Sequence, residues 1–157
     1  MFGFFKAKKE KIVSPADGTI VSLEDVPDEV FSQKLAGDGV ALKPISNTFV
    51  APVAGVVTKI FSTNHAFSIH TKSGLDVMVH IGLDTVALKG EGFKRLVEEG
   101  ATVSVGKPII SADLELIQSK GKNTITPIVL NYKKEFSLEK NSVKMVREGE
   151  LILSVTL

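Results

Sequence analysis

The chain has 157 residues, a length that suits one domain with a substantial buried core. Its composition is ordinary for a globular protein, and 19 basic against 18 acidic side chains leave a net charge of +1. This balance excludes the basic surface expected of a nucleic-acid-binding protein. The absence of cysteine excludes a disulfide scaffold, a thiol nucleophile and any cysteine-containing zinc site, and it fits a reducing compartment.

Residues 1–11 are the only candidate targeting segment. Their phenylalanines precede their lysines, whereas a secretory signal places charges first and a longer apolar run after them. The segment is also too short to span a bilayer. Two interpretations stay open: a flexible tail, or a weak membrane-surface anchor with phenylalanines in the interface and lysines on anionic lipid. Both predict a cytoplasmic protein with a single domain over residues 12–157.

The rest of the chain is predicted to form short strands. Runs rich in Val, Ile, Leu, Phe and Thr are separated by Gly, Pro, Asp, Asn and Ser. Their spacing indicates an all-β protein, a sandwich or barrel-like fold, with little room for crossover helices. The predicted strands cover residues 18–23, 39–43, 55–61, 66–71, 75–81, 107–112, 126–130 and 151–157.

Two short helical segments interrupt the strands. The first is predicted over residues 92–99, where Phe93, Leu96 and Val97 would share a face. The second is predicted over residues 113–120, with Asp113 placed to cap its N-terminus.

Without cysteine or tryptophan, the reactive candidates are the three histidines, His65, His70 and His80. Apolar residues alternate along residues 75–81, so His80 projects from the face opposite the main apolar row, together with Met78. Neutral imidazole is a good nucleophile near pH 7. Because Gly82 also lets a partner's backbone approach, His80 is suited to act as a phosphoryl acceptor.

His65 begins the preceding strand, and residues 72–74 are a plausible hairpin turn. A two-residue loop would set His65 opposite His80 on strands about 4.8 Å apart. A three-residue loop would place the two on opposite faces, and the sequence leaves both registers open. His70 has the opposite parity to His65 and is predicted to be exposed and uninvolved.

Two polar residues flank the histidines. Thr63 lies two residues before His65 and could orient a ring nitrogen through its hydroxyl. Asp84 follows His80 by four residues. Because a carboxylate repels a phosphoryl group, Asp84 either holds the turn or helps to expel the group toward an acceptor.

The string Val-His-Ile-Gly-Leu-Asp-Thr-Val at residues 79–86 and its continuation through residues 88–93 are more specific than any single histidine. They resemble the phosphorylation-site signature of the glucose-type IIA family of the bacterial sugar phosphotransferase system. Residues 64–69 resemble the family's other histidine segment. The similarity runs in order from about Ile12 to Asn131, and the last two dozen residues match only loosely.

This resemblance implies a phosphotransferase component that relays a phosphoryl group and needs no cofactor and no metal. His80 would accept the group from the phosphocarrier HPr and pass it to the IIB domain of a membrane sugar permease. His65 would stabilise the phosphorylated state by hydrogen bonding, with Thr63 supporting it. The family's antiparallel β-sandwich agrees with the strand pattern, and its members also regulate other proteins by binding. The sugar itself stays open, because specificity lies in the membrane partner.

The resemblance also implies a docking surface around the histidines. We call the apolar residues that map onto it the docking patch: Val30, Phe31, Phe61 and Met78. The flanking acids map onto Asp28 and Asp84. Met78 stands where the best-studied relatives have an aromatic residue, which leaves the partner preference open and the chemistry intact.

Three other interpretations compete with the relay. His80 and Asp84 have the spacing of a ligand pair in one zinc peptidase group, but that group's His-x-His pair is absent, and a metal bridging His65 and His80 in a complex stays open. Residues 98–107 resemble the turns of biotinyl or lipoyl carrier domains, but Lys72 lacks a carrier lysine's flanks. A module that only binds other proteins is compatible with a relay. The chain lacks a Walker-type loop, which argues against ATP as the donor.

Overall fold

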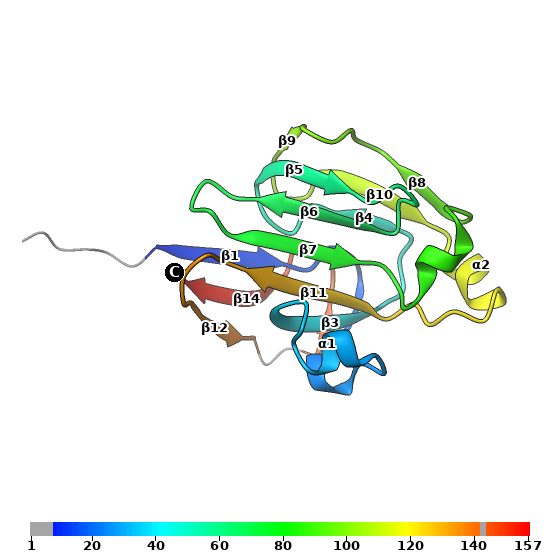
Figure 1. The fold of residues 1–157 in the computed structure, drawn as a ribbon, viewed down its shortest axis with the longest axis horizontal. Helices are drawn as coiled ribbons and strands as arrows, with labels where there is room; N and C mark the ends of the chain where they lie inside the picture. Colours follow the sequence, from blue (N-terminus) through cyan, green and yellow to red (C-terminus); the bar gives the residue numbers. More distant parts are fainter. Residues whose placement is uncertain (1–7, 142–143) are drawn as a thin grey trace, which may run out of the picture.

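Antiparallel strands form the framework of the molecule. The computed structural model describes residues 8–141 and 144–157, and its strands pack as layers of a β-sandwich (Figure 1). The predicted all-β fold is confirmed, because each predicted strand corresponds to a strand of the structure.

The largest sheet has eight strands in the order β13-β2-β3-β11-β7-β6-β5-β9. Sequence neighbours β5, β6 and β7 lie side by side, while β11 returns from late in the chain to pair with both β7 and β3. The strands are β2 (Gly18–Ser22), β3 (Asp38–Pro44), β5 (Gly55–Ile60), β6 (Ala66–His70), β7 (Asp76–His80), β9 (Thr102–Val103), β11 (Thr126–Asn131) and β13 (Met145–Val146).

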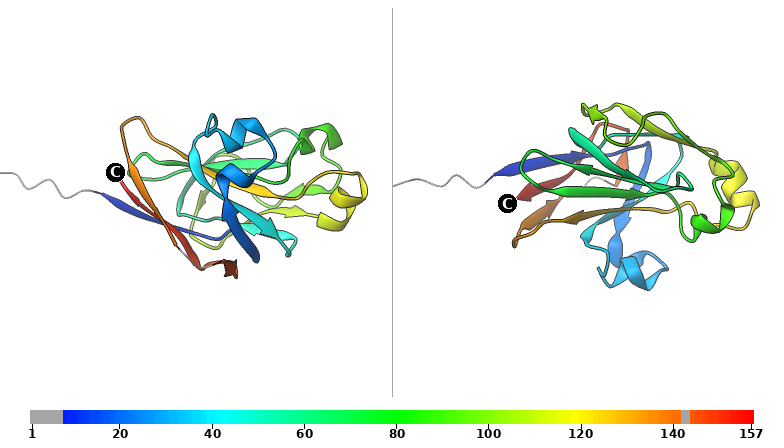
Figure 2. Two further views of the ribbon diagram at one scale, coloured as in Figure 1. Left: turned by 90° about the horizontal axis from the view of Figure 1, so that it is seen from below. Right: turned by 45° about the horizontal axis from the view of Figure 1, so that its top comes forward.

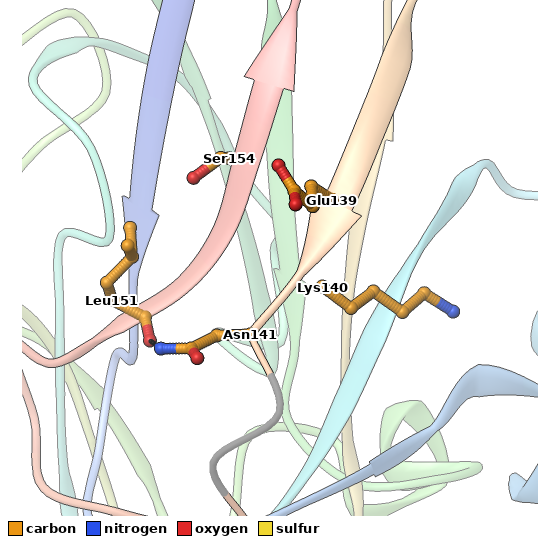
Figure 3. Close-up of a pocket in the computed structure, with 5 residues that line it drawn as sticks. All are labelled: Glu139, Lys140, Asn141, Leu151 and Ser154. Carbon is orange, nitrogen blue, oxygen red and sulfur yellow. Dashed lines mark hydrogen bonds between the residues drawn. The ribbon is translucent and has the colours of Figure 1, made fainter.

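Two three-stranded sheets complete the sandwich. Their orders are β4-β10-β8, from β4 (Thr48–Val50), β10 (Pro108–Ala112) and β8 (Phe93–Arg95), and β1-β14-β12, from β1 (Lys9–Val13), β14 (Leu151–Thr156) and β12 (Ser137–Lys140). A groove on β12 and β14 is lined by Glu139, Lys140, Asn141, Leu151 and Ser154 (Figure 3). At its lower end the side-chain amide of Asn141 donates to the Leu151 carbonyl at 2.8 Å. This groove belongs to a different sheet from the three histidines.

The helical segments are short, and an aspartate caps each of the two α-helices. They are η1 (Leu23–Asp25), α1 (Glu29–Ser32), η2 (Thr85–Leu88) and α2 (Leu114–Ser119). The side chains of Asp28 and Asp113 accept hydrogen bonds from the backbone N–H groups of Val30 and Leu116, which satisfies donors that have no partner within the helix. The region of η1 and α1 stands off one face of the large sheet (Figure 2).

The core has two parts on opposite faces of the large sheet. Strand alternation directs Val77 and Val79 of β7 into the main cluster, while Met78 points to the other face. There it packs against a smaller cluster beneath η1 and α1 that contains Leu23, Val26, Phe31, Ala41, Leu83, Ile125 and Val129. His80 therefore projects onto a face that is apolar at its own end.

One helix prediction is confirmed and one is wrong. Residues 113–120 contain α2 with the expected Asp113 cap. Residues 92–99 are not helical: β8 lies there, and the Leu96 N–H donates to the Ile109 carbonyl at 2.8 Å. Gly92 has a φ of 89°, which starts the segment outside helical geometry, and pairing with β10 then outweighs the weak helical pattern. Helix α1 has only four residues and no periodicity that could predict it.

The N-terminal boundary differs from the predicted one. Residues 9–11, assigned to the tail, belong to β1, where Lys9 pairs with Thr156 of β14. Backbone pairing with the last strand extends the sheet beyond the first buried residue, Ile12. Residues 1–7, on which the membrane-anchor interpretation rests, lie outside the described residues. Within residues 8–141 and 144–157, no helix is long and apolar enough to cross a membrane.

Candidate functional site

His80 is the last residue of β7 and is held by the turn that follows it. Its Nδ1 lies 2.8 Å from the carbonyl oxygen of Gly82. Because a carbonyl can only accept a hydrogen bond, Nδ1 carries the proton and Nε2 keeps the free lone pair. Gly82 makes this turn with a φ of 81°, and a Cβ there would lie 2.5 Å from Cγ2 of Thr85. The glycine is therefore required for the geometry that orients the ring.

His65 lies directly beside His80. The two ring centroids are 4.9 Å apart with an interplanar angle of 80°, and the His65 carbonyl accepts a hydrogen bond from the Ile81 N–H at 2.7 Å. Thr63 Oγ1 and His65 Nδ1 are 2.5 Å apart, as expected from the sequence spacing. The structure thus brings Thr63, His65 and His80 into one cluster.

The register of the hairpin shows why counting residues along its two strands gives the wrong placement of His65. Residue pairs Ala66–His80 and His70–Asp76 show that the turn is centred on Ser73, which is the alternative predicted to separate the two histidines. That prediction is wrong, because His65 precedes β6 and is not bound by its alternation. Asn64 adopts a φ of 60°, which bends the backbone at this point, and its side chain accepts a hydrogen bond from Arg95 at 2.8 Å.

Three phenylalanines surround the imidazoles. The ring of Phe31 in α1 lies 5.1 Å from that of His80, and the ring of Phe61 lies 5.2 Å from that of His65. Phe93 approaches His65 at 6.5 Å. Phe93 was not predicted as a site residue, since it lies 28 positions after His65 and was assigned to a helix. These rings limit the access of water to the histidines.

Burial lowers the pKa of both imidazoles. The pKa of His65 falls to about 4, because the ring is desolvated and a charge on it would be repelled by His80. Burial also lowers the pKa of His80, against the opposing effects of the Gly82 hydrogen bond and the Asp28 carboxylate. Both rings are consequently neutral at pH 7, the state in which His80 Nε2 can act as a nucleophile.

The predicted docking patch occupies several elements around the pair. Val30 is exposed on α1, whereas Phe31 of the same helix is buried. Met78 is half-buried against the smaller core cluster, and Phe61 is half-buried beside His65. Val86 of η2 is also exposed, although the sequence reasoning did not include it. Asp28 is engaged as the cap of α1.

Asp84 has a partner that sequence reasoning missed. Its carboxylate lies 2.9 Å from Nζ of Lys122, a residue 38 positions later. No local pattern could have signalled this pair, because it joins the turn after β7 to the segment between α2 and β11. The prediction that Asp84 holds the turn or helps to expel the phosphoryl group toward an acceptor stays open at this point.

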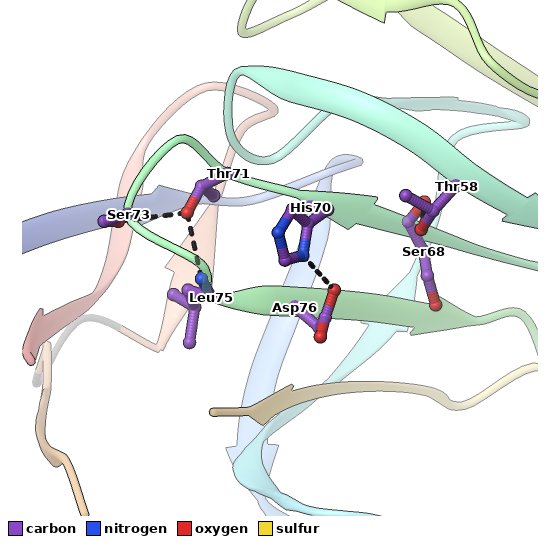
Figure 4. A network of polar contacts seen from close by, with 7 residues as sticks. All are labelled: Thr58, Ser68, His70, Thr71, Ser73, Leu75 and Asp76. Atoms are coloured by element: carbon purple, nitrogen blue, oxygen red, sulfur yellow. Dashed lines mark hydrogen bonds and ion pairs between the residues drawn. The ribbon is translucent and has the colours of Figure 1, made fainter. Parts of the chain in front are cut away.

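His70 occupies the opposite end of the hairpin and is exposed, as predicted. Its Nδ1 lies 2.8 Å from Asp76 Oδ1 (Figure 4). Beside it, the Thr71 hydroxyl accepts a hydrogen bond from the Leu75 N–H at 3.1 Å and contacts Ser73 in the turn. These contacts stabilise the turn, and they do not involve His65 or His80.

A metal site is not preformed in the part of the chain that the structure describes. There, no three side chains of His, Asp or Glu gather in a way that could hold a metal ion. His65 and His80 could supply two nitrogens, so a bridging metal would need ligands from elsewhere.

Comparisons with known proteins agree on one family. Residues 10–136 match the family model of the phosphoenolpyruvate-dependent sugar phosphotransferase system, EIIA 1. The chain is 48% identical over 151 residues to the PTS system glucose-specific EIIA component of Haemophilus influenzae, covering 96% of this chain and 91% of that one.

Two further relatives extend the comparison. The PTS system N-acetylglucosamine-specific EIICBA component of Klebsiella pneumoniae is 51% identical over 128 residues, which cover 82% of this chain but only 20% of that protein. The solved structure of glucose permease IIA from Mycoplasma capricolum matches with a TM-score of 0.89 and 39% identity, over 98% of this chain and 99% of that one.

Proposed function

The chain belongs to the EIIA 1 family of the phosphoenolpyruvate-dependent sugar phosphotransferase system, as a glucose-type EIIA component, and on this premise we propose that it relays a phosphoryl group through His80. The family acts in phosphoryl transfer for sugar uptake. The observation that carries the proposal is the hydrogen bond from His80 Nδ1 to the Gly82 carbonyl, which leaves Nε2 as the nucleophile.

The proposed reaction is a transfer between two imidazoles. The lone pair of His80 Nε2 attacks the phosphorus atom of phosphorylated HPr, a P–N bond forms, and the donor's P–N bond breaks and returns its electron pair to the donor ring. The reverse geometry then passes the group to a nucleophile on the IIB domain. Catalysis of this kind rests on alignment and on exclusion of water, and no cofactor or metal is needed.

His65 is proposed to stabilise the phosphorylated state. If the Thr63 hydroxyl donates to His65 Nδ1, the ring proton must sit on Nε2, where it can be donated to a phosphoryl oxygen. The lowered pKa of His65 keeps this ring neutral, so it acts as a hydrogen-bond donor and not as a fixed cation. Thr63 therefore acts through His65 as a positioning residue.

Both partners are proposed to dock on the same surface in turn. The docking patch supplies apolar area around the histidines, and Asp28 and Asp84 supply negative charge at its edge. A shared surface favours small, transient complexes. HPr and the IIB domain are the proposed partners, and one relative's name joins its IIA part to components B and C in a single chain. Other regulatory targets would use this surface as well.

The remaining proposals concern the chain as a whole. We propose that the sandwich from β1 onward acts as one phosphotransferase domain in the cytoplasm, and that the residues before β1 make at most weak contact with a membrane surface.

The test is direct phosphorylation of the intact chain. The protein is incubated with phosphoenolpyruvate, the general phosphotransferase enzyme and HPr, and its mass is measured. Wild type should gain one acid-labile phosphoryl group and His80→Ala should gain none. His65→Ala should still accept the group but fail to pass it on to a IIB domain. A folded wild type that takes no phosphoryl group would overturn the relay.

A further inference from the structure

Lys122 lies against the turn that follows His80, although the proposed relay assigns it no role. Its Nζ is 2.9 Å from Asp84 Oδ2, and its side chain is 24% exposed, whereas that of Asp84 is 72% exposed. Asp84 follows His80 by four residues, in the same turn whose Gly82 carbonyl holds the imidazole. A half-buried lysine side chain thus pairs with the carboxylate of the turn that holds the phosphoryl acceptor.

Backbone contacts set the position of this ammonium. The Leu83 N–H donates to the Asn123 carbonyl at 2.9 Å, which joins the residue before Asp84 to the residue after Lys122. A Cβ on Gly82 would lie 2.9 Å from that same Asn123 carbonyl, so the two segments are in close contact. On the other side, the Lys122 N–H donates to the Ile117 carbonyl of α2 at 3.2 Å. The pair is therefore arranged by the fold before any partner docks.

Phosphorylation creates an electrostatic conflict at this turn. The incoming group carries close to two negative charges, and Asp84 already places one there. Like charges in the same turn destabilise each other, and an adjacent cation offsets part of the repulsion. Asp28, the other acid of the site, is engaged by the Val30 N–H of α1. Asp84 accepts its hydrogen bond from Lys122.

We propose that Lys122 is a positioning residue of the relay, which stabilises the phosphorylated state of His80 by offsetting the charge of Asp84 and holding its carboxylate toward the segment between α2 and β11. The inference rests on the proposed function. Lys122 acts through Asp84 and not on the reacting atoms, so its removal should shift the balance of the transfer without abolishing it.

The test measures the equilibrium of phosphoryl transfer between HPr and the full-length chain, together with the rate at which phosphorylated His80 loses its group to water. Lys122→Met should shift the equilibrium toward phosphorylated HPr by about two- to fivefold, the size that a solvent-accessible ion pair produces. Lys122→Arg should restore the wild-type balance, because it keeps the charge. Asp84→Asn should shift the balance the other way.

Two comparisons separate this role from general effects. Lys120→Met removes the same charge two residues away, where the ammonium lies 3.3 Å from Glu91, and should leave the equilibrium unchanged. In an Asp84→Asn background, Lys122→Met should give a smaller shift, since the carboxylate that Lys122 holds in place is gone. Thermal unfolding of each variant shows whether stability changes in parallel.

Three results would overturn the inference while leaving the relay intact: an unchanged equilibrium in Lys122→Met, an equal shift in Lys120→Met, or an undiminished shift of Lys122→Met in the Asp84→Asn background. If wild type takes no phosphoryl group from HPr, the proposed function itself fails. The two failures are therefore distinguishable in one set of measurements.

Discussion

The β6–β7 hairpin carries a histidine toward each of its ends, and the two are in different environments. His80 is half-buried beside a second imidazole and a phenylalanine, with its Nδ1 proton held by the Gly82 carbonyl. His70 is exposed, and its Nδ1 lies 2.8 Å from Asp76. Both side chains project from the same face of the same two strands. Residue type and strand position therefore do not distinguish a phosphoryl acceptor from a surface histidine.

The difference comes from what covers each end of the sheet. The smaller core cluster under η1 and α1 reaches Met78 and Leu83, on either side of His80, and brings Phe31 against its ring. Among the described residues, no such cluster covers the His70 end, where the polar contacts of the turn lie instead. Burial at one end lowers the imidazole pKa and excludes water, which are the conditions that phosphoryl transfer needs.

The largest expected effect separates the two histidines outright. His70→Ala should accept one phosphoryl group at the wild-type rate, whereas His80→Ala accepts none, because only His80 has a free Nε2 inside the aromatic enclosure. Peptide mapping of the phosphorylated protein by mass spectrometry measures this. A phosphoryl group found on His70 in wild type would show that the contrast between the two ends is mistaken.

The comparison of the two ends can also be tested by measuring the stability of variants at the glycine that follows each histidine. Gly82 and Gly74 both have positive φ, but a Cβ on Gly82 would lie 2.5 Å from Thr85 Cγ2, whereas one on Gly74 would meet Tyr132 at 3.5 Å. Both alanine variants incur about 1–2 kcal/mol for the left-handed conformation. Gly82→Ala should lose about 1–3 kcal/mol more from overpacking. Denaturant unfolding would show the difference, and equal losses would contradict it.

Stability should also depend on pH through the buried end. Because the pKa of His65 is about 4 when folded against 6.5 as its ordinary value, the unfolded chain binds more protons between these pH values. The free energy of unfolding should therefore rise with pH across this window and fall on acidification, by on the order of 1–3 kcal/mol. The slope should flatten in His65→Gln and persist in His70→Gln. An unchanged slope in His65→Gln would argue against burial as the cause.

The smallest expected difference between the two ends concerns Thr63, beside His65, and Thr71, beside His70. Thr63→Val removes the hydroxyl that orients His65 and should slow transfer to the IIB domain by about tenfold, in line with the effect of losing an outer hydrogen-bond partner of a functional histidine. Thr71→Val removes the acceptor of the Leu75 N–H and should cost about 1 kcal/mol of stability with no effect on transfer. Single-turnover transfer and thermal unfolding separate the two. A stability loss without a rate loss in Thr63→Val would make its role structural.

Much of this fold could be predicted from the sequence because strand alternation is a local signal. The run from Leu75 to Ile81 predicts β7 and the direction of His80 without any knowledge of its neighbours. The helix predicted over residues 92–99 failed because pairing with β10 is not local, whereas the Asp113 cap and the residues that follow it were enough to predict α2.

The site was less accessible to such reasoning. The resemblance to a known family singled out His65 and His80, but strand arithmetic could not bring them together, because the bend at Asn64 lies outside the strand. Phe93 and Lys122 reach the site through pairings with distant segments. Contacts of this kind depend on topology, which cannot be predicted from a short stretch of the sequence.

The pairing of β1 with β14 has a consequence for how this domain can be joined to others. The Leu157 N–H donates to the Lys8 carbonyl at 2.8 Å, so the chain enters and leaves the sandwich at one point. Glu10 accepts a hydrogen bond from Ser73, which places that point at the His70 end of the hairpin. A short linker could therefore close the chain into a circular permutant, and a tether at either end would leave the His80 face free to swing between partners at high effective concentration.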